Sequence, residues 1–496
     1  MKQLFSSFSL ITFFLLSALF FVCNPLTAQN AQAAFPSLEP AFSPQQEPSS
    51  LSGEAIIRAA LDFSLCPRDS AAYTETLRRY RALEQAVCSA SYMQLSEEAR
   101  AEAVLTLMYE TTLSRYSLHQ SRMDRLFSEG TYNCVSSSAL YAALATACGI
   151  RVRGNVTRDH AFCTVYLSDG AGSQKKIDVE TTNPNGFNPG TKKPVETKGG
   201  GTAYFIVPKK SYNGRVEVSV SMLTGAIGRN MVSDFNEHDD YAHAVPLAAA
   251  RFPYAQTAAE KDAARADFDV VSANYALFLD HADRSARAVD WLEAVYTRYG
   301  KTAYLEEQYD AVAYNAVAVL VNAGNYTDAA AFLDAHRKNM KQKSAAALDE
   351  TVFLTGADAE IRLLSDTEPD TALLRLRELR ADSRAQTAQA KKRFSELTEY
   401  AWYQKARPFF DQKDYFSAAR TADEGLSEVP QSRNLQNLKK QALQNHAVGF
   451  HNRFAELANS GNLEEAKLVI EQGLKENPAN TTLQNDLRTV KRMMGQ

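Results

Sequence analysis

Cysteine, charge of one sign and cofactor motifs are all scarce in this chain. It holds six cysteines in 496 residues, too few for a fold held mainly by disulfides. Its net charge is −4 and its lysines and arginines are dispersed, so nothing indicates nucleic-acid binding. It has no CxxC pair, no HExxH motif and no phosphate-binding glycine loop, and we therefore predict neither a metal nor a cofactor.

Long apolar runs are also missing, apart from one near the N-terminus. The run Leu10 to Cys23 precedes Ala31-Gln32-Ala33, a small-x-small cleavage signature, and predicts a secretory signal peptide over residues 1–33. The alternatives are a lipoprotein signal lipidated on Cys23 and an uncleaved membrane anchor, for which the run is short. We expect an exported protein, periplasmic or secreted, that meets a membrane only if its N-terminus is lipidated or anchored.

Composition divides the rest of the chain into three parts. Residues 34–52 are rich in proline, serine and glutamine, which predicts a disordered linker. Residues 53–214 mix helical and strand signals and form the first predicted domain. Residues 215–496 are rich in alanine and almost wholly helical in pattern, and form the second. The apolar content of 45% is ordinary for globular domains, so both can bury a core.

The stretch from Gly130 to Pro184 carries the residues from which we predict chemistry. Asn133 is a good N-cap, and Cys134 follows at the first helical position. Unpaired N–H groups and the macrodipole favour a thiolate there. The pattern predicts a helix over Val135–Cys148, with Gly149 as its stop.

Two strands are predicted downstream by alternation of apolar and polar residues, His160 to Leu167 and Lys175 to Thr181, with a turn at Ser168–Ser173. If their hairpin is centred near residue 169 or 170, His160 and Asp178 share a face and reach one another by a hydrogen bond. An odd register would separate them. Glu180 is the alternative partner of the histidine. The predicted site residues are Cys134 as nucleophile, His160 as base and Asp178 as the orienter of that base.

This order resembles the transglutaminase-like superfamily, which is related to papain-type cysteine proteases. The matching residues are Asn133-Cys134, the helix that ends Cys148-Gly149-Ile150, Asp159 to Phe162, and Ile177-Asp178. The resemblance covers residues 53–208, and it implies an α+β domain that transfers acyl groups from an amide or peptide through a Cys-His-Asp triad. The superfamily includes cross-linkers, peptidases, amidases and inactive members, so the reaction stays open. Val135 replaces the aromatic residue that papain-type enzymes often have after the nucleophile, which argues against a close papain relative.

Each of these residues also has a plain structural interpretation. A cysteine at a helix start is often a small buried residue, and a histidine on a strand is often a core or surface residue. Gln120 and Tyr132 precede the nucleophile and are candidates for an oxyanion site, but a surface glutamine and a packing tyrosine are favoured. The backbone N–H of Cys134 is the safer oxyanion donor.

The number of cysteines predicts at least one free thiol in the mature chain. If Cys23 leaves with the signal, an odd number remains, so at least one stays free or pairs between molecules. Cys134 is the candidate for the free thiol. Cys66 and Cys88 are a candidate disulfide between two N-terminal helices, and the alternative is that all five are reduced.

The helical part contains a repeated local pattern that resembles tetratricopeptide repeats. A turn precedes an aromatic residue or leucine, and an alanine follows three residues later, at Tyr326, Tyr415 and Leu463, with a weaker copy at Tyr241. The last two units are 48 residues apart rather than ~34, so the repeats are irregular. The acidic and histidine-rich stretch at residues 237–243 is interpreted as a capped, solvated helix start rather than a metal cluster.

The sequence thus predicts a transglutaminase-like α+β domain followed by an all-α, tetratricopeptide-like scaffold. We expect a peptide or protein substrate in the first and a protein partner on the second. The alternative is a non-catalytic interaction scaffold in which the first domain is degenerate.

Overall fold

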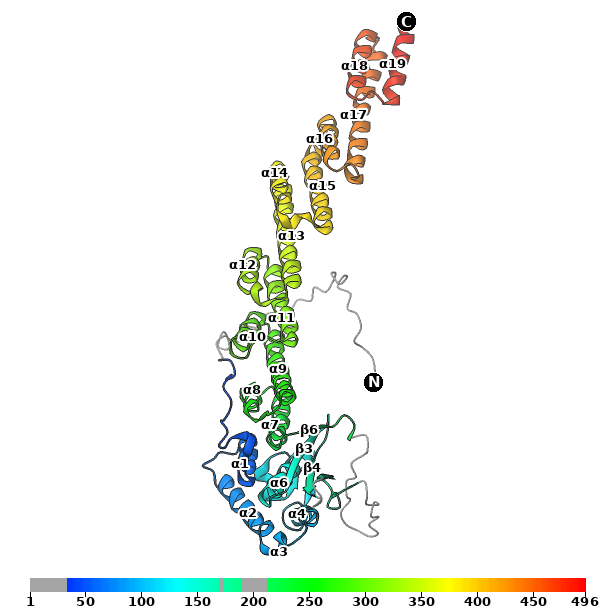
Figure 1. Cartoon of the computed structure of the whole chain (residues 1–496). Helices are drawn as coiled ribbons and strands as arrows, with labels where there is room; N and C mark the ends of the chain where they lie inside the picture. The colour runs from blue at the N-terminus through cyan, green and yellow to red at the C-terminus, as the bar shows by residue number, and fades with distance from the viewer. Residues whose placement is uncertain (1–33, 169–173, 190–211) are drawn as a thin grey trace.

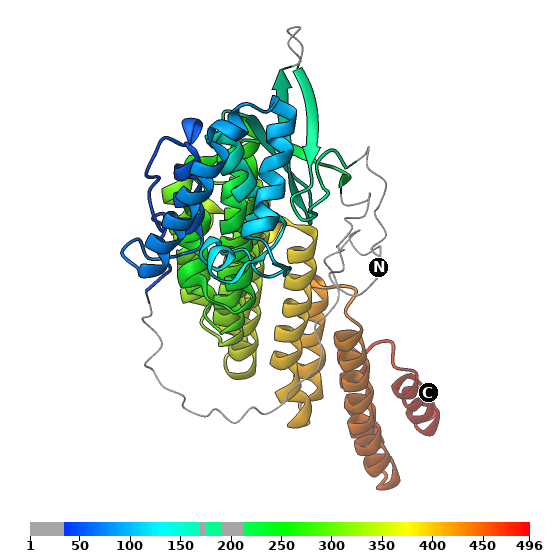
Figure 2. The ribbon, with the colours of Figure 1, turned by 90° about the horizontal axis from the view of Figure 1, so that it is seen from below.

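A computed structural model describes residues 34–168, 174–189 and 212–496 of the chain. A mixed front domain lies at one end, and a long array of helices extends from it to the C-terminus (Figure 1). In Figure 2 the later helices of the array lie progressively to one side of the earlier ones. The predicted signal peptide, and all but one residue of the predicted turn at 168–173, fall outside the described residues.

Serine caps fix the helices at the start of the front domain. Ser52, Ser70 and Ser96 each accept the backbone N–H of the residue three positions later, so an orphan donor of the first turn is satisfied. The helices of the front domain lie between residues 53 and 147. They are α1 (Gly53–Phe63), α2 (Ala71–Val87), α3 (Ala90–Met93), α4 (Glu97–Thr111), α5 (Met123–Glu129) and α6 (Cys134–Ala147).

The front domain also contains a four-stranded antiparallel sheet in the order β5-β4-β3-β6. Its β4 strand packs against α6, and almost every residue of that strand is buried. A two-residue parallel pair, β1 (Arg115–Tyr116) with β2 (Thr131–Tyr132), precedes α6. The main strands are β3 (Arg151–Val156), β4 (Ala161–Ser168), β5 (Gln174–Val179) and β6 (Val216–Val218).

The helical array alternates long and short helices. The short helices begin at residues 241, 285, 326, 369, 415 and 463, so successive starts are 41 to 48 residues apart. The sequence pattern identified four of these units and missed the two at Ser285 and Pro369. The long helices are α7 (Val220–Glu237), α9 (Ala258–His281), α11 (Ala303–Asn322), α13 (Gln342–Thr367), α15 (Ala388–Asp411) and α17 (Arg433–Asn459); the short ones are α8 (Tyr241–Ala249), α10 (Ser285–Tyr299), α12 (Tyr326–His336), α14 (Pro369–Arg380), α16 (Tyr415–Glu428) and α18 (Leu463–Glu476), and α19 (Thr481–Met493) ends the chain.

The turns and the small residues of the repeat have a common structure. Gly324, Lys413 and Gly461 all have positive φ. In each turn the backbone N–H of the residue that follows donates to the carbonyl five residues before it. This bond reverses the chain into the next helix. Three residues into each short helix an alanine is fully buried, because the neighbouring helix leaves no room for a larger side chain. These alanines are Ala244, Ala288, Ala329, Ala372, Ala418 and Ala466.

The front domain and the first half of the array share one hydrophobic core. It runs without a break from Ile56 on α1 to Val352 on α13. Helix α7 packs directly against α1, α6 and β3. A Cβ added at Gly228 of α7 would lie 2.5 Å from the Phe63 ring, so the backbone of α7 packs directly against that ring. The expected domain boundary at residues 214 and 215 therefore does not coincide with a break in the core, and the first such break lies within α13.

The segment 34–52 is an ordered strap rather than the expected disordered linker. It runs along the outside of the molecule from α10 to α1 (Figure 1). Phe35 packs edge-on against Tyr275 and Trp291, and Phe42 packs against Phe63. The composition misled because its few aromatic residues find partners on distant helices, which a local window does not contain.

Among the described residues, no helix combines the length and apolar character that a membrane span requires. The five described cysteines are all free thiols, so the suggested Cys66–Cys88 disulfide is not formed. The Cys66 thiol contacts Ser70, and Cys88 donates to the carbonyl of Ala147.

Candidate active site

The first residue of α6 is Cys134, as the sequence predicts. The Asn133 side chain accepts the N–H groups of Val135 and Ser136, and the Ser136 hydroxyl accepts the N–H of Asn133. This reciprocal capping box fixes the backbone of the first turn of α6, which carries the Cys134 side chain. Cys134 is 6% exposed and lines a cleft. Its backbone N–H has no acceptor among the described residues, so it is free to serve an incoming oxygen.

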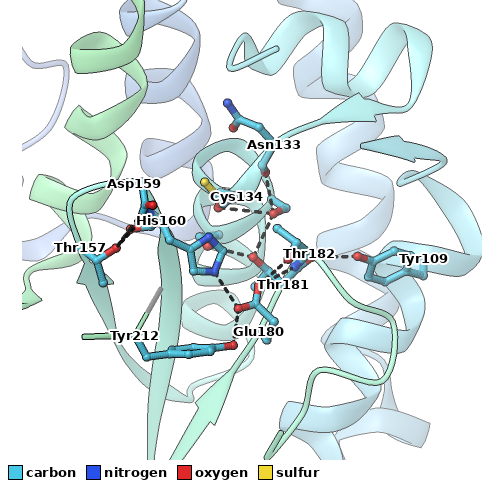
Figure 3. A network of polar contacts seen from close by, with 12 residues as sticks. Tyr109, Asn133, Cys134, Thr157, Asp159, His160, Glu180, Thr181, Thr182 and Tyr212 are labelled. Carbon is cyan, nitrogen blue, oxygen red and sulfur yellow. Dashed lines mark hydrogen bonds and ion pairs between the residues drawn. The ribbon is translucent and has the colours of Figure 1, made fainter. Parts of the chain in front are cut away.

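A tight turn between β3 and β4 presents His160. The strand begins one residue later than predicted, so the histidine is the last residue of that turn. Thr157 holds it on both sides, because its N–H donates to the His160 carbonyl and its hydroxyl accepts the His160 N–H. The ring nitrogen Nε2 lies 2.7 Å from Oε2 of Glu180. Nδ1 is therefore the nitrogen left for Cys134 (Figure 3).

The residue that orients His160 is Glu180, immediately after β5. It is 3% exposed, and both carboxylate oxygens are fully occupied. Oε2 accepts from His160 and from the Tyr212 hydroxyl, each at 2.7 Å. Oε1 accepts from the backbone N–H and the hydroxyl of Thr182, at 3.1 and 2.6 Å. Four donors around one buried carboxylate hold it ionised and in one orientation.

The electrostatics of this group favour a charged histidine. Burial on its own would lower the pKa of His160, but its hydrogen bonds with Cys134 and Glu180 outweigh burial and raise that pKa from 6.5 to about 10. Burial would likewise raise the pKa of Glu180, but the bonds from His160, Thr182 and Tyr212 hold it below the ordinary value. An imidazolium between a thiol and a carboxylate is the arrangement that activates a cysteine nucleophile.

The structure does not place Asp178 beside His160, which corrects the expected orienter. In the β4–β5 hairpin Thr164 pairs with Asp178, so its centre lies at residue 171 rather than 169 or 170. Asp178 does share the face of His160, but four residues further along the sheet. Its carboxylate accepts instead from Thr164 at 2.7 Å and from Arg215 at 2.6 Å. The same register brings Glu180, two residues later on that face, next to the histidine.

Tyr212 is a neighbour of His160 and Glu180 that sequence reasoning missed. Besides donating to Glu180, its ring packs edge-on against His160 and Phe162. It lies 32 residues beyond Glu180 along the chain, with no motif around it, so no local pattern signals the contact.

The two candidate oxyanion residues have structural roles, as favoured. The Gln120 amide donates to the carbonyls of Arg122 and Thr131 and thereby fixes the loop before α5. The Tyr132 hydroxyl bonds to that of Tyr109, which also donates to the Thr181 carbonyl. Both tyrosines thus clamp the segment that carries Glu180 to the start of α6.

The cleft at Cys134 has a volume of about 280 Å³ and lies between the front domain and the array. Its floor is the start of α6 and the turn that carries His160, and its far wall is one face of α7. Of the other thiols, Cys148 and Cys163 are buried, and burial raises the pKa of Cys148 to about 11. Among the described cysteines, Cys134 is the one that lines this cleft.

No group of three or more metal-ligating side chains occurs in the described part of the chain. In the stretch 237–243, Asp240 caps α8 and its carboxylate contacts Nδ1 of His243.

Comparisons of this chain with family models, with curated proteins and with solved structures found no match.

Proposed function

We propose that this chain is an exported, transglutaminase-like cysteine acyl transferase or hydrolase that acts on an amide or peptide bond. Cys134 is the nucleophile, His160 the acid and base, and Glu180 the orienter in place of Asp178. The observation that carries the proposal is the continuous contact from Cys134 through His160 to Glu180 at the edge of an open cleft.

The first half of the reaction forms a thioester. The Cys134 thiolate attacks the substrate carbonyl carbon, and the carbonyl electrons move to the oxygen, where the Cys134 N–H stabilises the negative charge. The carbonyl then re-forms as the C–N bond breaks. Nδ1 of His160 supplies the proton that the departing amine needs. Glu180 keeps the imidazolium oriented and neutralises its charge while this happens.

The second half releases the acyl group. Neutral His160 takes a proton from water or from an amine, which attacks the thioester carbon and expels the Cys134 thiolate. Water gives hydrolysis, and a lysine amine gives cross-linking. The cleft is open to solvent and polar in much of its lining, which suits either acceptor.

Cys134→Ala tests the proposal. We expect it to abolish acyl transfer from peptide and amide substrates while the free energy of unfolding falls by about 1 kcal/mol or less, because one sulfur at the cleft edge is lost. The measurements are a thermal melt and mass spectrometry of acyl-enzyme trapped with amide substrates. Exposed Cys88 is the matched control, because Cys88→Ala also removes one thiol and leaves the cleft intact. A large loss of stability in Cys134→Ala, together with a native Cys134 that resists iodoacetamide, would refute the catalytic function.

The array supports a second, binding role. Some large apolar side chains on its long helices are exposed, among them Val319 (58%) and Leu363 (69%). Scaffolds of stacked helix pairs use such surfaces for proteins or peptides. If Cys134 proves unreactive, this interaction function is the one that remains, and it is tested by binding assays on the intact Cys134→Ala protein.

A further inference from the structure

One face of α7 forms a wall of the cleft. Ala226, Asn230, Ser233 and Glu237 recur at helical spacing and all line it. Because α7 is the first helix of the array, the array completes the reaction centre rather than merely following it.

Asn230 connects this wall to the cap of the nucleophile helix. Its Nδ2 donates to the Ser121 hydroxyl oxygen at 2.9 Å, and Nδ2 of Asn133 donates to the same oxygen at 2.7 Å. Ser121 is 2% exposed, so water does not readily replace either bond. Asn133 in turn uses its Oδ1 to accept the N–H groups of the first turn of α6.

We propose that Asn230 is a positioning residue that fixes the Cys134 backbone through Ser121 and Asn133. An amide cap works only in one orientation, since its oxygen must face the helix and its nitrogen must face away. Ser121 accepts on the far side of the Asn133 amide, where the Leu118 carbonyl also accepts from Nδ2 at 3.1 Å, and Asn230 holds the Ser121 hydroxyl oxygen from α7. The chain of three side chains transmits the position of α7 to the start of α6.

This inference rests on the proposed function but is tested without a substrate. The measurement is the rate of Cys134 alkylation by iodoacetamide from pH 5 to 10, followed by mass spectrometry of its peptide. Cys88 is the internal reference in the same sample: the residue is exposed, and partial burial of its thiol and the nearby Glu84 raise its pKa above the usual value, which keeps it protonated to higher pH. In the wild type we expect Cys134 to react at a pH where Cys88 does not.

We expect Asn230→Ala to slow Cys134 alkylation at pH 6 by roughly three- to tenfold, the factor that one hydrogen bond is worth, and to move the midpoint of the pH profile upward. Asn274→Ala is the matched control. Asn274 donates from α9 to Asn236 of α7 at 2.9 Å, so its loss also loosens α7 but does not reach the cap. We expect that control to lower the melting temperature without changing the pH profile.

A double-mutant cycle separates positioning from general damage. Ser121→Ala removes the middle of the chain, so Asn230→Ala should add little to it, whereas independent effects would add. Additive effects, or a pH profile of Asn230→Ala equal to that of the wild type, would overturn the positioning role and leave the proposed function standing. A wild-type Cys134 that reacts no faster than Cys88 across the range would overturn both.

Discussion

Glu180→Gln tests whether the orientation of His160 needs the charge of a carboxylate or only a polar group of the same shape. Glutamine has almost the volume of glutamate, so packing is preserved and the negative charge is removed. The four donors around the carboxylate come from His160, Tyr212 and two groups of Thr182. An amide offers one oxygen and an NH₂ group, so one oxygen of the original pair is replaced by a donor that faces other donors. We expect the free energy of unfolding to fall by about 1–3 kcal/mol.

The larger effect should be on chemistry. The pKa of His160 is about 10 against an ordinary 6.5, a net difference of about 5 kcal/mol that Cys134 and Glu180 produce against the opposing effect of burial. If roughly half of this net difference comes from Glu180, the variant loses about 2.5 kcal/mol of stabilisation of the imidazolium, or ~70-fold in rate. The pH-rate profile of acyl transfer measures it, and we expect the alkaline limb of that profile to move to lower pH, because the imidazolium of the variant loses its proton earlier.

Asp178→Asn is the matched control for this experiment. Asp178 is part of the same hairpin and loses the same charge, but its partners are Thr164 and a half-exposed Arg215. An exposed ion pair contributes about 1 kcal/mol or less, so we expect a small change in stability and an unchanged pH profile. If Asp178→Asn were as damaging as Glu180→Gln, or if Glu180→Gln kept full activity, the assignment of Glu180 as orienter would be refuted.

Two further variants test the pH dependence and the strap. Because the pKa of His160 is raised, its contribution to stability is complete below about pH 6.5 and is lost as the pH rises toward 10. The difference in free energy of unfolding between wild type and His160→Gln, measured with urea, should therefore be larger at pH 6 than at pH 9. A difference that grows with pH would contradict this sign. Phe35→Ala removes the ring that packs against Tyr275 and Trp291, and because Phe35 is half-buried we expect a loss of about 2 kcal/mol in the same assay, whereas exposed Ser37→Ala should be silent. Equal effects of the two substitutions would show that the strap is not anchored there.

Local sequence determined the elements of this protein. The N-cap at Asn133, the cysteine at the first position of α6 and the stop at Gly149 all follow from interactions within one helix turn. The turns at Gly324, Lys413 and Gly461 follow from backbone conformation and a small residue shortly after. Two repeat units escaped notice because Ser285 and Pro369 start them without the aromatic residue or leucine that marks the others.

Tertiary structure decided the partners. Whether Asp178 or Glu180 meets His160 depends on hairpin register, and a shift of the centre by one or two residues changes the neighbour while the alternation of faces stays the same. Tyr212, Asn230 and the strap residue Phe35 reach their contacts from far along the chain, and no local window contains both partners. The sequence by itself thus determined which groups the site has available, because capping and periodicity are short-range. Hairpin register and the packing of the front domain against α7 decided which of them meet, because only the folded core brings distant segments within the length of a hydrogen bond.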